Sequence, residues 1–281
     1  MLVAVTGASG FIGQHVLAEL MGRGLDVVSI TRTVGRLTNV GVGIREVRMD
    51  IADADAHSYD RLGRPDMLIH LAWGGLPNYK SLHHYEAELP QQYRFLKSLI
   101  GSGLPALLVA GTCFEYGMQS GALSEELATA PTNPYGYAKD ALRRQLEFLR
   151  AFHQFTLTWA RLFYVYGDGQ TKSSLLPQLQ AAIARRDKVF NMSGGEQLRD
   201  YLPVAEAAHL LVDLALHGRD YAVVNVCSGE PISVRRLVEG WLKQNAWDIT
   251  LNFGHYSYPD YESMGFWGDR RRLNAILERR R

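Results

Sequence analysis

Apolar runs and amphipathic segments alternate along the first 163 residues. Six short segments have the pattern of strands, at residues 2–5, 25–31, 44–49, 66–72, 104–110 and 155–161, and most of them are apolar runs. Between them lie segments that favour helices, at 11–23, 53–62, 81–102 and 133–152. Strands and helices that alternate in this way build a parallel sheet with helices on both faces. We therefore predict an α/β fold with a Rossmann-type, doubly wound parallel sheet.

The alternation loosens beyond Tyr164. Helices are expected at 173–186, 204–217 and 233–244, and strands at 188–192, 221–227 and 249–253. The stretch after residue 253 is rich in aromatic side chains. We predict a dinucleotide-binding Rossmann domain over 1–163, to which 198–226 returns, and a smaller substrate-binding domain made of 164–197 and 227–281. The smaller domain would close over the carboxyl ends of the strands, where ligands bind in such sheets.

The composition limits the kinds of binding partner that we expect for the protein. A chain of 281 residues, 47% of them hydrophobic, can build a large core. Lys and Arg number 30 against 29 Asp and Glu, so no basic excess points to nucleic acid. Two cysteines, Cys113 and Cys227, support neither a disulfide framework nor a metal cluster. Because we see no leader peptide and no apolar run of membrane-spanning length, we expect a cytoplasmic protein without membrane contact.

A glycine-rich turn follows the first predicted strand. Glycine lets the backbone turn tightly and lets a ligand approach where a Cβ would clash. The N-terminus of the following helix presents N–H groups that favour a phosphate. The alternative is a tight turn without a ligand. We favour a dinucleotide pyrophosphate site, with cofactor contacts at Gly7, Ser9, Gly10, Phe11, Ile12 and Gly13.

Two side chains with acid–base chemistry lie one turn apart on the predicted helix at 133–152. Tyr135 and Lys139 are four residues apart, so their side chains share a face. A free phenol has a pKa of about 10, and a nearby ammonium lowers that pKa by stabilising the phenolate. The pair could then serve as a general acid or base, although taken alone it could be ordinary surface. Thr112, at the carboxyl end of the fifth strand, is either a capping residue or a hydrogen-bond partner of a reacting oxygen beside Tyr135.

Five motifs together resemble one enzyme family. They are TGASGFIG at 6–13, GTCFEYG at 111–117, PYGYAK at 134–139, RLFYVYG at 161–167 and RDYLPV at 199–204. In this order they resemble the extended short-chain dehydrogenase/reductase family, over essentially the whole chain. The resemblance implies a bound nicotinamide dinucleotide, a nucleotide-linked sugar as substrate, and a catalytic triad of Thr112, Tyr135 and Lys139. Tyr135 would exchange a proton with the sugar oxygen, Lys139 would hold the cofactor ribose, and Thr112 would orient the oxygen.

The resemblance also assigns further contacts. Asp50 and Ile51 resemble a pair that contacts adenine, and Leu71 and Ala72 are expected beside the cofactor at the end of the fourth strand. Arg199 would contact the diphosphate, with a salt-bridged surface arginine as the alternative. The expected substrate contacts are Thr112, Cys113, Phe114, Tyr164 and Arg199.

The end of the second strand favours NADP over NAD. Members of the family that use NAD usually carry an Asp there, which holds the ribose 2′-hydroxyl, whereas this chain has Thr31 and Arg32. A carboxylate would repel a 2′-phosphate, while a threonine with an arginine would bind it. We therefore expect NADP(H) as the cofactor, with NAD less favoured.

Departures from the family pattern narrow the chemistry. The 4,6-dehydratase branch has Asp-Glu directly after the active-site threonine, and 3,5-epimerases have a cysteine two residues after it. Here Cys113 and Phe114 follow Thr112, so neither reaction is expected and Cys113 is interpreted as a packed side chain.

Other departures concern the pocket. Glu88 stands where the family often has an asparagine near the nicotinamide ribose, and Tyr164 replaces an asparagine that touches the substrate. Tyr164 and the cluster His83, His84 and Tyr85 would shape a different sugar pocket. Adjacent histidines on a helix diverge and no third ligand accompanies them, so we expect no metal site.

These features favour NADPH-dependent reduction of the C4 keto group of a CDP- or dTDP-linked 4-keto-6-deoxyhexose. The 111–117 loop and the FWGD stretch at 266–269 resemble reductases that make such deoxysugars. A nucleotide-sugar 4-epimerase with a tightly bound cofactor is one alternative, and a non-catalytic dinucleotide sensor is another. The resemblance further implies a homodimer through the helices at 81–102 and 133–152, the second of which is apolar on more than one side.

Overall fold

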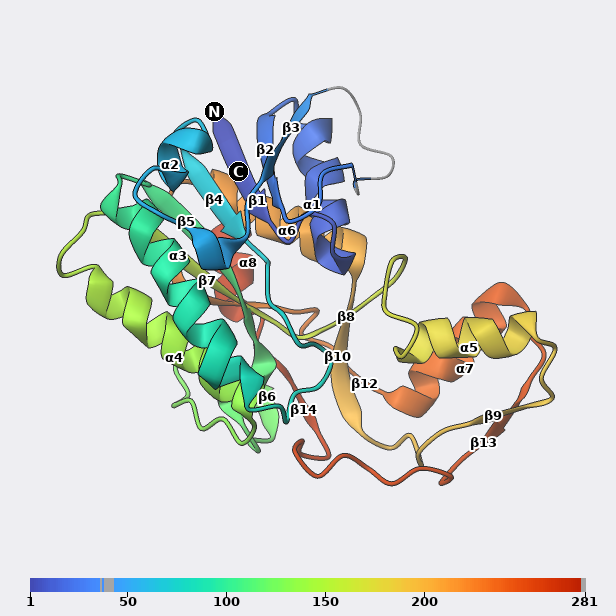
Figure 1. Cartoon of the computed structure of the whole chain (residues 1–281). Helices are drawn as coiled ribbons and strands as arrows, with labels where there is room; N and C mark the ends of the chain where they lie inside the picture. The colour runs from blue at the N-terminus through green and yellow to red at the C-terminus, as the bar shows by residue number, and fades with distance from the viewer. Residues whose placement is uncertain (36, 38–42, 279–281) are drawn as a thin grey trace.

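A parallel seven-stranded sheet forms the centre of the fold (Figure 1). The computed structural model describes residues 1–35, 37 and 43–278. The sheet order is β11-β7-β5-β4-β1-β2-β3, and every pairing in it is parallel. The strands are β1 (Leu2–Thr6), β2 (Asp26–Thr31), β3 (Ile44–Arg48), β4 (Met67–His70), β5 (Ala106–Thr112), β7 (Thr156–Leu162) and β11 (Ala222–Val226). The chain winds outward from β1 in both directions, so the predicted doubly wound fold is confirmed.

Helices cover both faces of this sheet (Figure 1). One face packs against α1 (Phe11–Gly22), α6 (Val204–Leu216) and α8 (Arg271–Glu278). The other packs against α2 (Ser58–Arg61), α3 (Leu89–Gly101) and α4 (Pro134–Leu149). Each face has its own apolar core, as a sheet buried on both sides requires.

Local chemistry fixes where the two helices beside the site begin. The Asn133 side chain caps α4, accepting a hydrogen bond from the Gly136 backbone N–H at 2.8 Å, and Pro134 occupies the first turn. For the helix predicted over 81–102, the sequence leaves open whether Pro90 breaks it, kinks it or marks its true start, and the structure shows the last. A short π-helix, η2 (His84–Glu88), precedes α3, and Pro90 stands in the first turn of α3, where a missing N–H costs nothing.

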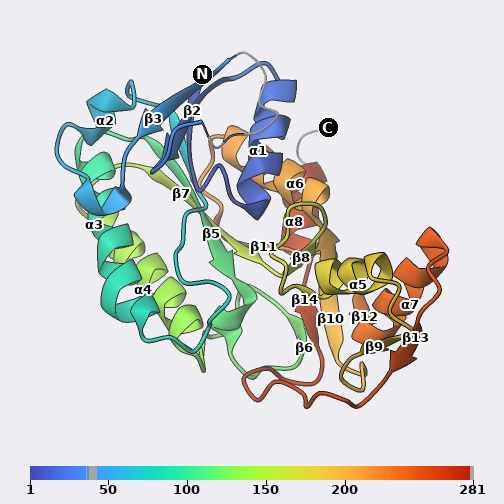
Figure 2. The same cartoon turned by 45° about the vertical axis from the view of Figure 1, so that its right-hand side comes forward.

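A smaller part of the molecule lies beyond the carboxyl ends of the strands (Figure 2). Its three-stranded sheet has the order β12-β10-β8. Its elements are β8 (Tyr164–Tyr166), α5 (Leu175–Ala184), β9 (Val189–Asn191), β10 (Leu198–Pro203), β12 (Pro231–Ser233), α7 (Val234–Asn245) and β13 (Thr250–Asn252). The helices α5 and α7 share a separate apolar core with the strands β9 and β13. Segments far apart in the sequence therefore meet around this core.

Several short helices and strands are not predicted by the pattern of apolar and polar residues. The stretch between the predicted strand at 104–110 and the predicted helix at 133–152 contains the 3₁₀ helix η3 (Cys113–Tyr116) and the strand β6 (Gly121–Leu123), which pairs with β14 (Phe266–Gly268). A second 3₁₀ helix, η1 (Ile51–Asp53), follows β3. Within 198–226, β10 joins the smaller sheet, whereas α6 and β11 lie with the large one. The division into two domains stays a prediction.

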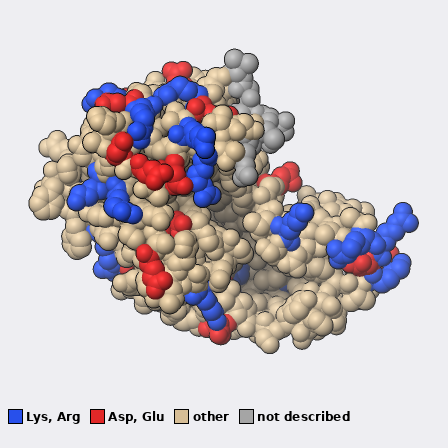
Figure 3. All heavy atoms as spheres, in the orientation of Figure 1, with Lys and Arg blue, Asp and Glu red and all other residues tan. Residues whose placement is uncertain are grey.

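The molecular surface is hollowed between the large sheet and the smaller part (Figure 3). On the face shown, acidic and basic side chains are interspersed over the elements around the large sheet (Figure 3). None of the helices in the described part of the chain is long and apolar enough to cross a membrane.

Candidate active site

The turn between β1 and α1 leaves no room for larger side chains. Gly7 has a φ of +69°, and a Cβ there would lie 2.8 Å from the Ala72 backbone nitrogen. A Cβ on Gly13 would overlap the Gly7 carbonyl oxygen. Gly10 is the N-cap of α1, and its N–H donates to the Gly7 carbonyl at 2.9 Å. The glycines thus bring the N-terminus of α1 close to the ends of β1 and β4.

This turn borders a cavity of about 800 Å³. Seven of the predicted cofactor contacts line it: Gly7, Ser9, Gly10, Arg32, Asp50, Ile51 and Ala72. Phe11, Ile12 and Gly13 form the first turn of α1, and Leu71 follows β4; these four do not line the cavity. A glycine cradle that a Cβ would fill, a helix N-terminus and a lining drawn from the ends of β1, β2 and β4 fit a dinucleotide.

The predicted 2′-phosphate contacts lie at one end of the cavity. Thr31 is buried, and its hydroxyl donates a hydrogen bond to the Thr33 carbonyl at 2.9 Å. The Thr31 hydroxyl oxygen in turn accepts a hydrogen bond from the Thr33 backbone N–H at 3.2 Å. Arg32 is exposed on the cavity wall. Asp50 caps η1 by accepting from the Ala52 N–H at 3.0 Å. Thr31 therefore shapes the turn, and Arg32 presents the positive charge.

The other end of the cavity holds a carboxylate. Glu88 lines the cavity, accepts from the Gln92 side chain at 2.9 Å and lies 3.2 Å from His83 Nε2. Burial raises the pKa of Glu88, but hydrogen bonds from the Gly74 backbone, Gln92 and His83 outweigh it and lower the pKa. Glu88 is therefore ionised at neutral pH.

Gln92 continues this polar contact inward to a buried histidine. Its amide oxygen lies 2.7 Å from His70 Nε2, and His70 Nδ1 lies 2.9 Å from the Thr6 hydroxyl. Burial lowers the pKa of His70 to about 3, with the Lys139 charge acting in the same direction. His70 is thus a neutral structural link. The sequence patterns single out neither His70 nor Gln92, because neither belongs to a recognisable motif.

Tyr135 and Lys139 are both buried, on the face of α4 that meets β5. Lys139 Nζ donates to the Ala110 carbonyl at 2.9 Å and lies 4.0 Å from the centre of the Trp73 ring. Burial lowers the pKa of Lys139 to about 7, although the Glu115 and Glu88 charges oppose the shift. Trp73 lines the cavity, so it joins the lysine to the cofactor side.

Burial changes the pKa of Tyr135. It raises the pKa of the phenol above its ordinary value, with Tyr79, Glu115 and Cys113 adding to the rise and a hydrogen bond with Thr112 opposing it. The sequence-based expectation that Lys139 lowers this pKa is therefore wrong for this structure. Tyr135 is a protonated phenol at neutral pH, which is the form that donates a proton.

Thr112 lies at the end of β5, next to Tyr135. Its hydroxyl oxygen accepts from the Phe114 N–H at 3.3 Å, capping η3. Gly136 lets α4 approach this turn, because a Cβ there would lie 2.5 Å from the Phe114 carbonyl oxygen. The structure thus brings Thr112, Tyr135 and Lys139 together, as the sequence predicts.

Aromatic rings from separate segments form a wall beside Tyr135. The Tyr79 ring centre lies 4.8 Å from that of Phe114 and 5.5 Å from that of Tyr135. Tyr261, from the aromatic-rich C-terminal stretch, lies 6.0 Å from Phe114. A salt bridge of 2.7 Å between Lys80 and Asp260 ties the two outer segments together. Neither Tyr79 nor Tyr261 is identifiable as a site residue from the sequence.

The other predicted substrate residues lie near this wall, where their polar groups are buried. Arg199 is buried, and its guanidinium pairs with Glu262 at 2.6 Å and stacks 4.5 Å from the Phe266 ring centre. Tyr164 lies beside it, with its ring centre 5.9 Å from the guanidinium carbon. Burial raises the pKa of the Cys113 thiol, which packs in an apolar cluster and stays neutral. Arg199 is thus salt-bridged in this structure, to a buried rather than a surface partner, and its contact with the diphosphate stays a prediction.

Three comparisons with known proteins agree with this geometry. The model of the NAD dependent epimerase/dehydratase family matches residues 3–227. A dTDP-6-deoxy-L-talose 4-dehydrogenase (NAD(+)) from Aggregatibacter actinomycetemcomitans is 28% identical over 270 residues, covering 95% of this chain and 99% of that protein. A UDP-glucose 4-epimerase from Streptomyces lividans is 28% identical, covering 84% of this chain and 78% of the epimerase. The solved structure of MoeE5 with UDP-glucuronic acid and NAD superposes with a TM-score of 0.85 at 28% identity, covering 99% of this chain and 93% of MoeE5.

Proposed function

The chain belongs to the NAD dependent epimerase/dehydratase family, and we propose that it is an NADPH-dependent reductase of the C4 keto group of a nucleotide-activated 4-keto-6-deoxyhexose. That it is an enzyme with a dinucleotide cofactor follows from the family. The observation that carries the finer proposal is the position of Tyr135 next to Thr112, with its ring between Trp73 of the cofactor cavity and Tyr79 of the aromatic wall. The A. actinomycetemcomitans relative is named for oxidation at C4 of a dTDP-linked 6-deoxysugar, and ketone reduction is the reverse of such a reaction.

The residues supply what a ketone reduction needs on the protein side. A bound nicotinamide dinucleotide supplies the hydride. Tyr135 donates its proton to the sugar oxygen at C4, and Thr112 donates a hydrogen bond to that oxygen as its negative charge develops. Lys139 holds the cofactor ribose, and its protonated form places a positive charge beside Tyr135. The Tyr79, Phe114 and Tyr261 rings exclude water and cover the apolar face of the sugar.

Arg32 supports NADP(H) as the cofactor. It is the cation on the cavity wall that follows β2, and its guanidinium can bind a 2′-phosphate with two hydrogen bonds. The residue before it, Thr31, carries no charge that would repel the phosphate. NAD stays the less favoured cofactor.

A direct test offers the protein NADPH and CDP- or dTDP-linked 4-keto-6-deoxyhexoses and follows NADPH consumption. We expect one equivalent of NADPH to be oxidised per sugar reduced, with no consumption when the sugar is omitted. A protein that binds NADPH and consumes none with any of these sugars would contradict the proposal.

A nucleotide-sugar 4-epimerase is the second candidate. It is favoured by the similarity to the S. lividans UDP-glucose 4-epimerase and by a triad that would serve either reaction. An epimerase would retain its cofactor through purification and interconvert two sugars without net NAD(P)H consumption. A non-catalytic sensor of the dinucleotide would do neither.

We also propose a homodimer in the cytoplasm. Phe148 and Phe152, at and just beyond the end of α4, are 75% and 81% exposed, and Tyr137 on the same helix is 55% exposed. Such exposed apolar side chains favour burial against a second copy. Both cysteines are free thiols, as a reducing compartment leaves them. Light scattering at micromolar concentration tests the dimer, and a monomeric mass would count against it.

A further inference from the structure

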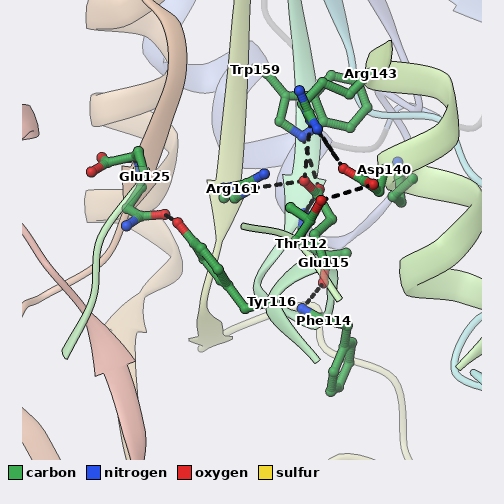
Figure 4. Close-up of polar contacts among 12 residues, drawn as sticks. Thr112, Phe114, Glu115, Tyr116, Glu125, Asp140, Arg143, Trp159 and Arg161 are labelled. Atoms are coloured by element: carbon green, nitrogen blue, oxygen red, sulfur yellow. Dashed lines mark hydrogen bonds and ion pairs between the residues drawn. The ribbon is translucent and has the colours of Figure 1, made fainter. Parts of the chain in front are cut away.

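A fully buried carboxylate lies directly behind the active-site threonine. Glu115, on η3, has no exposed surface, and it does not line the cofactor cavity. Buried charges are costly unless every lone pair finds a donor. Figure 4 shows the Glu115 carboxylate beside Thr112 of β5 and beside Trp159 and Arg161 of β7, each of which donates a hydrogen bond to it.

Each of these donors has a distinct place in the site. Glu115 Oε1 accepts from the Thr112 backbone N–H at 2.9 Å and from the Trp159 indole N–H at 2.8 Å. Glu115 Oε2 accepts from Arg161 Nε at 2.7 Å, and Arg143 Nε on α4 lies 4.0 Å away. One carboxylate therefore joins the end of β5 to β7 and faces the helix that carries Tyr135 and Lys139.

The neighbouring backbone is built around this contact. A Cβ on Gly111 would lie 2.7 Å from Glu115 Oε1 and would overlap the indole nitrogen of Trp159. The glycine at 111 is thus required by the side chains that meet there, and not by a turn. Arg143 also pairs with Asp140 at 2.6 Å, the residue after Lys139, so the same network reaches the helix of the triad (Figure 4).

Glu115 and Thr112 cap the same short helix from opposite ends of one turn. The carboxylate accepts the Thr112 N–H, while the Thr112 hydroxyl oxygen accepts the Phe114 N–H, so the two residues form a reciprocal capping box. A hydroxyl has one hydrogen to donate and two acceptor sites. With one acceptor site occupied by Phe114, the hydrogen is left to point toward Tyr135 and the substrate oxygen.

We propose that Glu115 is a positioning residue of the reaction: its carboxylate fixes the backbone of Thr112 so that the threonine hydroxyl faces the reacting oxygen. The inference rests on the proposed function, since it assigns Glu115 a role in the same ketone reduction. Glu115 itself touches neither substrate nor cofactor. The contrasting role is purely structural, in which Glu115 only compensates the buried Arg161 charge.

Two double variants separate these roles. Glu115→Gln alone would leave Arg161 buried without a counter-charge and could prevent folding. Both double variants therefore carry Arg161→Met, which removes that charge. Glu115→Gln/Arg161→Met keeps an amide oxygen that can accept the Thr112 N–H, whereas Glu115→Met/Arg161→Met has a side chain of similar length and no acceptor. Trp159→Phe serves as a stability control, because it removes another donor to Glu115 without changing Thr112.

The kinetic expectation is specific to the Thr112 contact. Compared with Glu115→Gln/Arg161→Met, the Glu115→Met/Arg161→Met protein should lose about 10- to 100-fold in kcat, with NADPH affinity unchanged. In a Thr112→Val background the same exchange of Gln for Met should change kcat by less than about threefold, because the hydroxyl that Glu115 positions is gone. An equal kcat in the two double variants would overturn the proposal. So would a loss of kcat on exchanging Gln for Met that is the same in the Thr112→Val background as in its absence. A kcat that follows melting temperature across all variants, Trp159→Phe included, would also overturn it.

Crystal structures of the two double variants provide a readout that needs no substrate. We expect the Thr112 hydroxyl to keep its contact with Tyr135 in the Gln variant and to rotate away in the Met variant. An unchanged Thr112 in both would contradict the positioning role. A wild-type protein that reduces no nucleotide sugar would contradict the proposed function instead, and the crystallographic comparison would still decide the role of Glu115.

Discussion

The two halves of the site are built in different ways. The cofactor half consists of chain turns that follow neighbouring parallel strands, and its glycines, Arg32 and Asp50 line one open cavity. The substrate half is assembled from segments near residues 79, 114, 199 and 261, whose charges are already paired with one another. The residues of a half built from turns at strand ends can be recognised in short sequence motifs. The residues of a half built from distant segments meet only through tertiary packing. If this contrast is functional, a variant in one half should leave the ligand affinity of the other unchanged.

Loss of the Tyr135 proton should have the largest effect. Tyr135→Phe removes one oxygen from a buried ring, so the fold and NADPH affinity should persist. The rate of reduction should fall by roughly 10²- to 10⁴-fold, the usual contribution of a positioned acid. Single-turnover kinetics, with NADPH titration as the control, measures both quantities. Undiminished turnover would reject Tyr135 as the proton donor.

Removal of the Arg32 charge should weaken cofactor binding and leave substrate binding unchanged. Arg32→Ala should reduce NADPH affinity by about 10- to 100-fold, since a charge-assisted hydrogen bond contributes about 1.5–3 kcal/mol. NADH affinity and the KM for the sugar should change little. Isothermal titration with both cofactors gives the comparison, and equal wild-type affinities for NADPH and NADH would remove the basis of the NADP assignment.

Glu262 offers the corresponding test in the substrate half. It pairs with Arg199 at 2.6 Å, so a sugar diphosphate must compete with a carboxylate for the same guanidinium. Glu262→Gln should lower the KM for the nucleotide sugar by about threefold to tenfold and leave NADPH affinity unchanged. Steady-state kinetics at fixed NADPH tests this. A higher KM at an unchanged melting temperature would show that Glu262 instead holds Arg199 in place for the substrate.

The smallest effect concerns stability and pH. Burial holds the pKa of Lys139 at about 7, against 10.5 for an ordinary lysine. Above about pH 7 the folded protein releases this proton while the unfolded chain keeps it, so the free energy of unfolding rises with pH until the ordinary lysine pKa is reached. Wild type should therefore gain about 1 kcal/mol relative to Lys139→Met between pH 7 and pH 8. Parallel urea titrations of the cofactor-free proteins measure this difference. A difference that is constant with pH would mean that Lys139 keeps its charge.

The sequence predicts the large sheet because most of its strands are apolar runs bounded by polar turns, as 66–72 shows. It also places Thr112, Tyr135 and Lys139 together, because their motifs stand at fixed positions relative to β5 and α4. It does not predict β6 or β14, since a three-residue strand has no periodicity to recognise.

The raised pKa of Tyr135 also lies beyond sequence reasoning. The spacing to Lys139 gives the distance between the two side chains but not the burial that dominates the phenol. In the same way, the carboxylate partner of Arg199 comes from 63 residues away, through the fold of the C-terminal stretch. Motifs therefore identify which residues meet, and packing decides their charge states.

The most direct measurement of the central claim follows the hydride itself. The protein is supplied with NADPH deuterated at the transferable position and with a CDP- or dTDP-linked 4-keto-6-deoxyhexose, and the product is examined by NMR. Reduction at C4 predicts one deuterium at C4 of the product for each NADPH oxidised. Deuterium at another carbon, or sugars interconverted with no deuterium gained and no NADPH consumed, would contradict it.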